Sequence, residues 1–85
     1  MKKKLSILGS TGSIGLNVLK IYKKKQKDFE INILAADKNY NLICKQIRIF
    51  KPNIFLINNS IIYEKIKKKY KNNKVKIISN IVLEE

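Results

Sequence analysis

The amino-acid sequence predicts an α/β fold, a partial doubly wound parallel sheet with the element order β-α-β-α-β-α-β and the strand order 3-2-1-4. Four apolar runs, at residues 5–8, 30–36, 53–58 and 75–78, have the length and composition of buried strands. The longer segments between them carry apolar residues at helical spacing, and the connections are short. Strands that alternate with helices in this way form parallel sheets with right-handed crossovers.

This arrangement has consequences for the sheet. Residues 30–36 are apolar at nearly every position, which predicts a strand buried on both faces. With strand four beside strand one, a crevice forms above strand one, between the turn that follows it and strand four. Strand four is then an unprotected edge where the chain ends.

The first helix is predicted over residues 13–25. Its apolar stripe consists of Ile14, Val18, Leu19 and Tyr22. The first turn of this helix carries no acidic residue, which leaves the positive end of the helix dipole free for an anionic ligand.

The two later helices have recognisable caps. Asn39 or Asn41 can cap the second helix, which ends before Pro52 because the residue preceding a proline avoids the helical region. Ser60 can cap the third helix. The predicted inward positions are Leu42, Ile43, Ile47 and Phe50 in the second helix and Ile61, Ile62, Ile66 and Tyr70 in the third.

Three evenly spaced glycines, Gly9, Gly12 and Gly15, separate the first strand from the first helix, and we call residues 9–15 the glycine turn. A backbone without Cβ atoms can approach a phosphate closely, and the helix N-terminus offers free N–H groups. The spacing Gly-x-x-Gly-x-x-Gly differs from the commoner Gly-x-Gly-x-x-Gly of dinucleotide folds. Its place between a strand and a helix nevertheless favours a dinucleotide site over a tight turn that binds no ligand.

The choice between NAD and NADP is usually made at the end of the second strand, about 20 residues beyond the glycines. Asp37 lies there and would accept hydrogen bonds from the ribose hydroxyls of NAD while repelling the 2′-phosphate of NADP. Lys38 beside it would attract that phosphate. The two residues conflict, so the spacing does not decide between the cofactors.

The formal net charge of +13 is compatible with nucleic acid, an anionic membrane surface or a phosphorylated ligand. The chain contains 18 Lys, 16 Ile and 10 Asn, three residue types that share A/T-rich codons. Because the uncharged Ile and Asn are enriched together with Lys, compositional bias explains the charge better than selection for a basic surface. Arg48 is the only arginine, whereas proteins that read nucleic acids usually rely on arginine.

A small basic RNA-binding module is the alternative from another functional class. Residues 9–12, Gly-Ser-Thr-Gly, match the GXXG loop of KH domains. That loop joins two helices, whereas a strand is predicted before residues 9–12. Nucleic acid is therefore the less favoured partner.

Two Tyr-x-x-x-Lys pairs, Tyr63 with Lys67 and Tyr70 with Lys74, resemble the catalytic pair of short-chain dehydrogenases. Such pairs arise by chance in a lysine-rich chain, and neither lies late enough in the β-α series to reach a nicotinamide. We assign neither pair a catalytic role.

The sequence predicts a cytoplasmic protein with no membrane partner and no metal site. No window reaches about 18 uncharged apolar residues, the length of a transmembrane helix. The basic residues 2–4 precede only a short apolar run, too short for a secretory signal. Cys44 has no cysteine partner and the chain contains no histidine, so Cys44 is predicted to be a small core residue.

A group of residues around the glycine turn carries a family resemblance. They are Gly-Ser-Thr-Gly-Ser-Ile-Gly at residues 9–15 after a Lys-Leu-Ser-Ile strand, then Phe29, Ala36, Lys38-Asn39 and the Phe50-x-Pro52 turn. They resemble the N-terminus of the 1-deoxy-D-xylulose 5-phosphate reductoisomerases, and the resemblance covers most of the chain. It implies a Rossmann-like fold and an NADPH-dependent oxidoreductase of the non-mevalonate isoprenoid pathway. Enzymes of this family isomerise a ketose phosphate and reduce the product to 2-C-methyl-D-erythritol 4-phosphate.

The resemblance also implies a cofactor site. Its residues are Thr11, Gly12, Ser13, Ile14, Lys38 and Asn39. The first four would hold the cofactor phosphates, and the last two would lie at the adenosine ribose and its 2′-phosphate. The family pattern after the second strand is Ala-Gly-Lys-Asn, and here Asp37 replaces the glycine, which places a carboxylate near that phosphate.

Family enzymes are several times longer, and their metal ligands, substrate-phosphate site and catalytic lid lie beyond the length of this chain. We therefore expect residues 1–85 to be the N-terminal half of a dinucleotide-binding domain, without catalytic or metal-binding residues. The divalent metal (Mg or Mn), the sugar-phosphate substrate and the homodimer belong to the full-length family enzyme. The chain alone is expected to bind nucleotide weakly and to be catalytically inactive. The start of another NAD(P) oxidoreductase is a further alternative.

Overall fold

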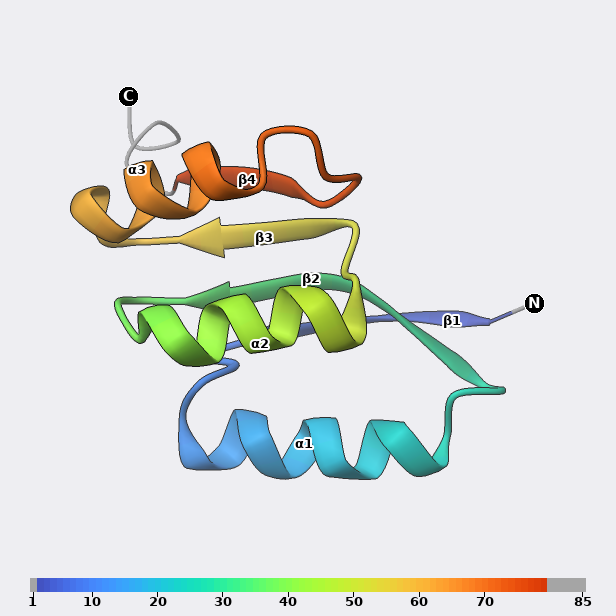
Figure 1. Ribbon diagram of the computed structural model, residues 1–85. Coiled ribbons are helices and arrows are strands. Elements are labelled where there is room, and N and C mark those ends of the chain that lie inside the picture. Colours follow the sequence, from blue (N-terminus) through green and yellow to red (C-terminus); the bar gives the residue numbers. More distant parts are fainter. Residues whose placement is uncertain (1, 80–85) are drawn as a thin grey trace.

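The computed structural model describes residues 2–79 and contains the seven elements in the predicted order (Figure 1). Their bounds are β1 Lys3–Leu8, α1 Ser13–Lys24, β2 Phe29–Ala36, α2 Tyr40–Phe50, β3 Ile54–Ile57, α3 Ser60–Lys69 and β4 Lys76–Ser79. In this part of the chain, no helix has the length and apolar character that a membrane span requires.

The sheet is parallel, and its strand order is β1-β2-β3-β4. The predicted neighbours one, two and three are confirmed, whereas the placement of strand four beside strand one is wrong. β4 pairs with β3, in register from Ile54↔Lys76 to Ile57↔Ser79. The physical reason is packing: α3 lies against α2, β3 and β4, so the third crossover steps in the same direction as the first two.

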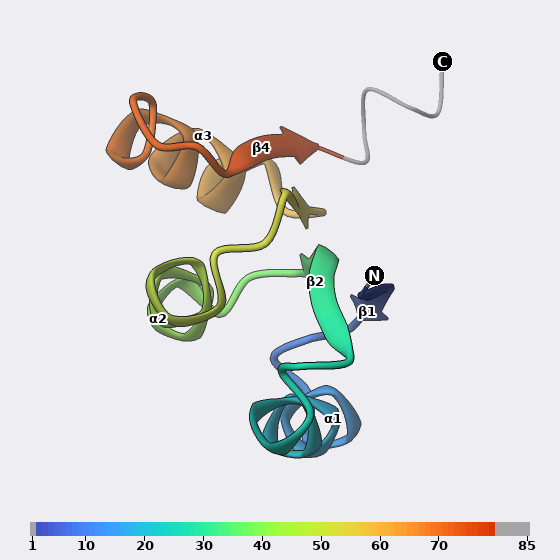
Figure 2. The same cartoon turned by 90° about the vertical axis from the view of Figure 1, so that its right-hand side faces the viewer.

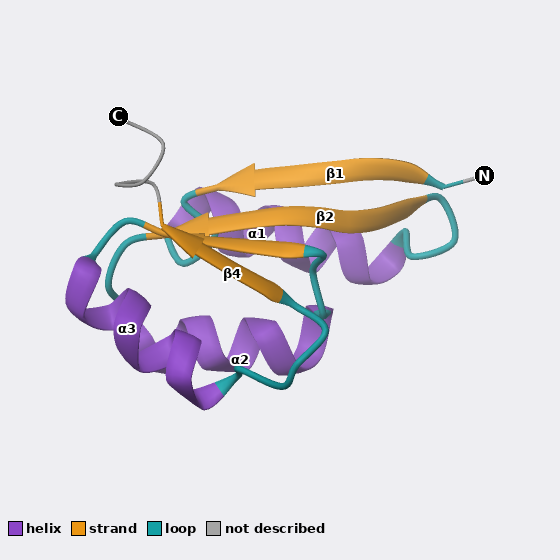
Figure 3. Ribbon diagram, turned by 90° about the horizontal axis from the view of Figure 1, so that it is seen from above, coloured by secondary structure: helices purple, strands orange, loops and turns teal. Residues whose placement is uncertain are grey.

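All three helices lie on one face of the sheet, as the two views of Figures 2 and 3 show. Successive right-handed crossovers that step in the same direction place their helices on the same side. Side chains that point to the helices, such as Ile7 and Phe55, are buried. On the opposite face Leu8 is 78% exposed and Leu56 is half-buried, so burial on both faces, predicted for residues 30–36, does not extend across the described sheet.

The core lies between this sheet and the helices. Its largest fully buried apolar side chains are Phe55, Leu34, Ile43, Ile47, Ile57 and Ile66. Two residues that were predicted to face the core do not: Ile14 is 81% exposed and Ile61 is 66% exposed. Gly15 and Leu19 occupy the buried side of α1 instead.

Asparagine side chains cap two of the helices. The Asn39 side chain accepts a hydrogen bond from the Leu42 N–H at 3.2 Å, which selects Asn39 over Asn41 as the cap of α2. The Asn59 side chain accepts one from the Ile62 N–H at 3.1 Å. Ser60 is therefore the first residue of α3 rather than its cap, because the extended backbone of Asn59 places its amide oxygen over the first turn.

We predict that Ile66→Ala and Ile61→Ala differ sharply in their effect on stability. Both residues are isoleucines on α3, but Ile66 is fully buried and Ile61 is 66% exposed. Truncating the buried side chain should lower the free energy of unfolding by about 2–5 kcal/mol, and truncating the exposed one by less than about 0.5 kcal/mol. Urea unfolding followed by circular dichroism measures both values. Equal losses would contradict the packing described for α3.

Candidate functional site

The glycine turn follows β1 and bends the chain sharply into α1. Gly9 has φ +73°, in the left-handed region that residues other than glycine rarely adopt. The Gly12 N–H donates to the Gly9 carbonyl oxygen at 3.0 Å and closes the turn. Gly9 is therefore required for the direction in which the chain leaves the sheet.

The first turn of α1 packs directly on the backbone of this bend. A Cβ added to Gly15 would overlap the carbonyl oxygen of Gly9 and would lie 2.8 Å from the Cα of Ser10. Both neighbours are backbone atoms that cannot rotate away. A Cβ on Gly12 would meet only the Gly9 carbonyl oxygen, at 3.4 Å, which is an ordinary contact. Close backbone packing thus explains Gly15, and Gly12 lies exposed at the outer side of the turn.

The N-terminus of α1 has free backbone donors. Its cap is Gly12, which has no side chain to accept a hydrogen bond. Within residues 2–79 the N–H groups of Ser13, Ile14 and Gly15 make no hydrogen bond, whereas the starts of α2 and α3 are capped by Asn39 and Asn59. The first turn of α1 contains no acidic residue. Free N–H groups and the positive end of a helix dipole favour an anion at this position.

The loop after β2 lies at the same edge of the sheet. The Ser10 N–H of the glycine turn donates to the Ala35 carbonyl oxygen near the end of β2, at 2.8 Å. Residues 37–39 follow β2 directly and are exposed. The structure thus brings the predicted phosphate residues 11–14 and the predicted ribose residues, Lys38 and Asn39, to the carboxyl ends of two adjacent strands. The crevice predicted between the glycine turn and strand four does not form, because β4 lies at the other end of the sheet.

Gln46 is a residue of the site that the sequence analysis missed. Its side chain is 2% exposed and bonds Ser10, which is fully buried within the glycine turn. The Ser10 hydroxyl donates to Gln46 Oε1 at 2.7 Å, and Gln46 Nε2 donates to the Ser10 carbonyl oxygen at 2.8 Å. The sequence did contain a signal for Gln46: it is a polar residue at an inward position of the helix, three residues after the core residue Ile43.

The Tyr-x-x-x-Lys pairs do not approach the glycine turn. Tyr63 and Lys67 both lie on α3, with Lys67 Nζ 5.3 Å from the centroid of the Tyr63 ring. A hydrogen bond to Tyr63 raises the pKa of Lys67. Since α3 packs on β3 and β4 while the glycine turn follows β1, this pair is a local contact of one helix.

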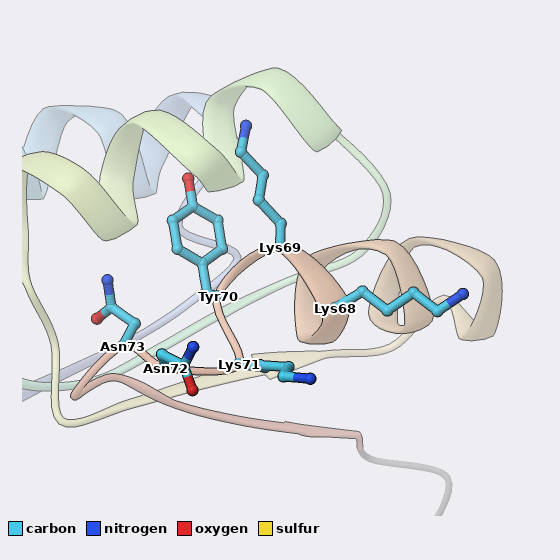
Figure 4. A pocket seen from close by; sticks show the side chains of 6 residues that line it. All are labelled: Lys68, Lys69, Tyr70, Lys71, Asn72 and Asn73. Atoms are coloured by element: carbon cyan, nitrogen blue, oxygen red, sulfur yellow. The ribbon is translucent and has the colours of Figure 1, made fainter.

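A hollow of about 550 Å³ lies where α3 leads into β4, at the opposite edge of the sheet (Figure 4). Its lining residues are Lys68, Lys69, Tyr70, Lys71, Asn72 and Asn73. In Figure 4 Lys69 and Tyr70 point toward α2, while Lys68 and Lys71 point elsewhere, so the three lysines do not converge on one point.

Cys44 of α2 contacts two of these residues and is itself a core residue, as predicted, with 3% of its surface exposed. Tyr70 donates its hydroxyl proton to the Cys44 carbonyl oxygen at 3.5 Å, and burial raises the pKa of Tyr70. Lys69 Nζ lies 3.8 Å from Cys44 Sγ, and the electrostatic influence of that sulfur raises the pKa of Lys69. These contacts attach the end of α3 to α2.

Residues 2–79 contain no group of three or more His, Cys, Asp or Glu side chains that could hold a metal ion. The donors of this part of the chain therefore do not fit a divalent cation, and we derive no chemistry through one.

Comparison with known proteins gives a consistent result. The sequence model of the 1-deoxy-D-xylulose 5-phosphate reductoisomerase family matches residues 5–83. The enzyme of that name from Pelagibacter ubique is 41% identical over 78 residues, which are 92% of this chain and 20% of the relative. The one from Halothermothrix orenii is 48% identical over 59 residues, 69% of this chain and 15% of the relative. The chain thus spans about a fifth of the length of the curated relatives it matches.

Solved structures share the fold. The 1-deoxy-D-xylulose 5-phosphate reductoisomerase of Zymomonas mobilis in complex with NADPH matches with a TM-score of 0.84 at 19% identity, covering 93% of this chain and 21% of that one. A DOX-P reductoisomerase in complex with NADPH, fosmidomycin and magnesium matches with a TM-score of 0.83 at 24% identity, over 91% of this chain and 19% of that one.

We predict that Gly15→Ala is disruptive and Gly12→Ala is tolerated by the fold. The alanine Cβ at residue 15 overlaps backbone, whereas at residue 12 it makes an ordinary contact. Overpacking of this kind should lower the free energy of unfolding by about 1–3 kcal/mol for Gly15→Ala. Chemical denaturation of both variants measures the difference, and a Gly15→Ala variant as stable as Gly12→Ala would contradict the close packing of α1 on the turn.

Proposed function

The chain belongs to the 1-deoxy-D-xylulose 5-phosphate reductoisomerase family, and on this premise we propose that its glycine turn binds the phosphates of NADPH. The observation that carries the proposal is the uncapped start of α1, where the N–H groups of Ser13, Ile14 and Gly15 are free beside a bend without Cβ atoms at Gly9 and Gly12. A pyrophosphate can accept hydrogen bonds from such groups without displacing a side chain.

Each predicted residue has a role in this proposal. Thr11, Ser13 and Ile14 act through backbone N–H groups, which agrees with the high exposure of the Ile14 side chain. The Gly12 N–H is bonded to Gly9, so Gly12 contributes by lacking a Cβ, which lets a phosphate approach the backbone. Lys38 supplies a cation for the 2′-phosphate. Asn39 uses its side-chain oxygen to cap α2, which leaves its amide NH₂ to donate to the ribose.

Asp37 is the residue that opposes NADPH. It lies exposed at the end of β2, next to Lys38, where the sequence resemblance places the 2′-phosphate. A like charge about 4 Å from a phosphate in a solvated site costs about 1 kcal/mol. We propose that Asp37 weakens the binding of NADPH more than the binding of NADH, because NADH lacks the 2′-phosphate.

For the whole protein we propose the activity that the names of its relatives state, that of a 1-deoxy-D-xylulose 5-phosphate reductoisomerase, with the NADPH found in two of the similar solved structures as its reductant. Bound NADPH supplies the hydride for such a reduction, and residues 2–79 contribute only the binding of its phosphates and ribose. The chain by itself is proposed to bind nucleotide without catalysing the reaction. The cytoplasmic location and the homodimer stay predictions that belong to this proposal.

We predict that the 85-residue chain binds NADPH with saturable one-to-one stoichiometry in a calorimetric titration. Raising the salt concentration from roughly 50 to 200 mM should weaken NADPH binding only modestly, because the cofactor carries few phosphates. An RNA-binding module would instead bind a short RNA and lose affinity steeply with salt. RNA binding without NADPH binding would overturn the proposal; the strand β1 before residues 9–12 already departs from the KH arrangement.

We predict that Asp37→Gly and Asp37→Asn tighten NADPH binding by about fivefold, as a relief of about 1 kcal/mol requires, and NADH binding by less. Asp28→Asn is the matched control, since it removes one negative charge from the loop before β2, at the other edge of the sheet. Its affinity for both cofactors should stay close to that of the unaltered chain. An equal gain for NADPH and NADH in the Asp37 variants would show that Asp37 does not face the 2′-phosphate.

A further inference from the structure

Two polar side chains are buried together beneath the glycine turn. Ser10 is fully buried and Gln46 is 2% exposed, and we call this pair the Ser10/Gln46 clamp. Burying a hydroxyl and an amide is unfavourable unless both are hydrogen-bonded. The two bonds of the clamp, at 2.7 Å and 2.8 Å, join residues 36 positions apart in the sequence. No buried side-chain nitrogen or oxygen in the described residues lacks a partner.

The chemistry of the groups determines the orientation of the Gln46 amide. The Ser10 carbonyl oxygen can only accept a hydrogen bond, so the NH₂ of Gln46 must face it. The Gln46 oxygen is then left for the Ser10 hydroxyl, which can donate. The amide therefore has one satisfactory orientation, in which it holds the carbonyl of Ser10.

The hydrogen bond to the Ser10 carbonyl also determines the direction of the Thr11 N–H. The described residues contain no cis peptide bond, and in a trans peptide the C=O and N–H groups point in opposite directions. Because the Ser10 carbonyl is directed at Gln46 of α2, the Thr11 N–H on the same peptide is directed away from α2. Within residues 2–79 this N–H makes no hydrogen bond.

The backbone N–H of Ser10, which belongs to the preceding peptide, attaches this residue to β2. This N–H donates to the Ala35 carbonyl oxygen of β2 at 2.8 Å. The backbone N–H, the carbonyl and the hydroxyl of Ser10 are thus all bonded, to β2 on one side and α2 on the other. Among the described residues only Gln46 bonds the Ser10 carbonyl, so removing its side chain frees the Ser10–Thr11 peptide.

We infer that Gln46 is a positioning residue for the anion site: it orients the Ser10–Thr11 peptide so that the Thr11 N–H joins the free N–H groups at the start of α1 in binding a phosphate. This inference rests on the proposed function and adds to it a residue on another element that touches no ligand. α2 thereby takes part in the shape of a binding turn that belongs to β1 and α1.

The test compares NADP⁺ binding by the full 85-residue chain, Gln46→Met and Ile57→Val. Methionine keeps the length of the side chain but cannot donate to the carbonyl, and affinity should fall about tenfold, as for the loss of one hydrogen bond to a charged group. Ile57→Val removes one buried methylene from β3 and controls for a general loss of stability, with affinity expected within about twofold of the unaltered chain. In proton–nitrogen NMR spectra, NADP⁺ should shift the Thr11 amide proton of the unaltered chain and of Ile57→Val, but not that of Gln46→Met.

Gln46→Glu keeps the inference testable if Gln46→Met does not fold. A protonated glutamic acid can donate to the Ser10 carbonyl, whereas the carboxylate can only repel it, and burial raises the pKa of such a carboxyl group. Affinity relative to the unaltered chain should therefore be retained at low pH and lost as the pH rises through that pKa. A pH-independent ratio of the two affinities would overturn the inference.

The outcomes separate the inference from the proposed function. If the unaltered chain binds NADP⁺ and Gln46→Met binds equally well, with the same shift of the Thr11 amide, the inference is wrong and the proposed function stands. If the unaltered chain binds no NADP⁺, both are wrong.

Discussion

The position of the glycine turn depends on the hydrogen bonds of one residue, Ser10. Its N–H is bonded to Ala35 of β2, and its carbonyl and hydroxyl are bonded to Gln46 of α2. β1 pairs with only one strand in the described sheet, so it cannot by itself determine how the chain leaves its end. The glycine turn therefore requires β2 and α2 to be in place, although its own residues all belong to α1 and to the bend between β1 and α1.

The direction of the crossovers explains the rest of the architecture. Each strand is added on the same side of the one before it, so the helices share one face and the loops that follow the strands share one edge. The start of α1 and residues 37–39 meet at that edge because β1 and β2 are neighbours. β4 is three positions away from β1, so the candidate site involves the β1–β2 end of the sheet and leaves α3 and β4 a structural role.

Many of the lysines lie in the last turns of the helices rather than at the glycine turn. Lys23 and Lys24 lie in the last turn of α1, and residues 67–69 supply three lysines to the last turn of α3. Lysines at these positions interact favourably with the negative ends of the helix dipoles. In a parallel α/β unit the helix C-termini lie at the edge opposite the glycine turn. In the proposed site an anion would therefore be attracted mainly by backbone N–H groups, which agrees with the compositional explanation of the lysine content.

The sequence by itself determined the features that depend on neighbouring residues. The order of the seven elements, the glycine turn before α1 and a cap of α2 at Asn39 or Asn41 were predictable, because periodicity, glycine spacing and caps act within a few residues. The structure then selected Asn39. The placement of residues 38 and 39 beside the turn followed from pairing of consecutive strands, which is also a short-range rule. Patterns between neighbouring residues thus predicted most of the candidate site.

Only the tertiary structure decided the features that depend on distant contacts. The position of β4 beside β3 depends on the packing of α3 against α2, β3 and β4. The exposure of Ile14 and Ile61 depends on which side of each helix faces the sheet. The bond between Ser10 and Gln46 joins residues 36 positions apart, and helical periodicity, which places Gln46 on the inward side of α2, does not identify Ser10 as its partner. Two polar side chains that are buried together bond each other because packing has removed the water from both. The contribution of Gln46 to the candidate site could therefore be identified only in the folded structure.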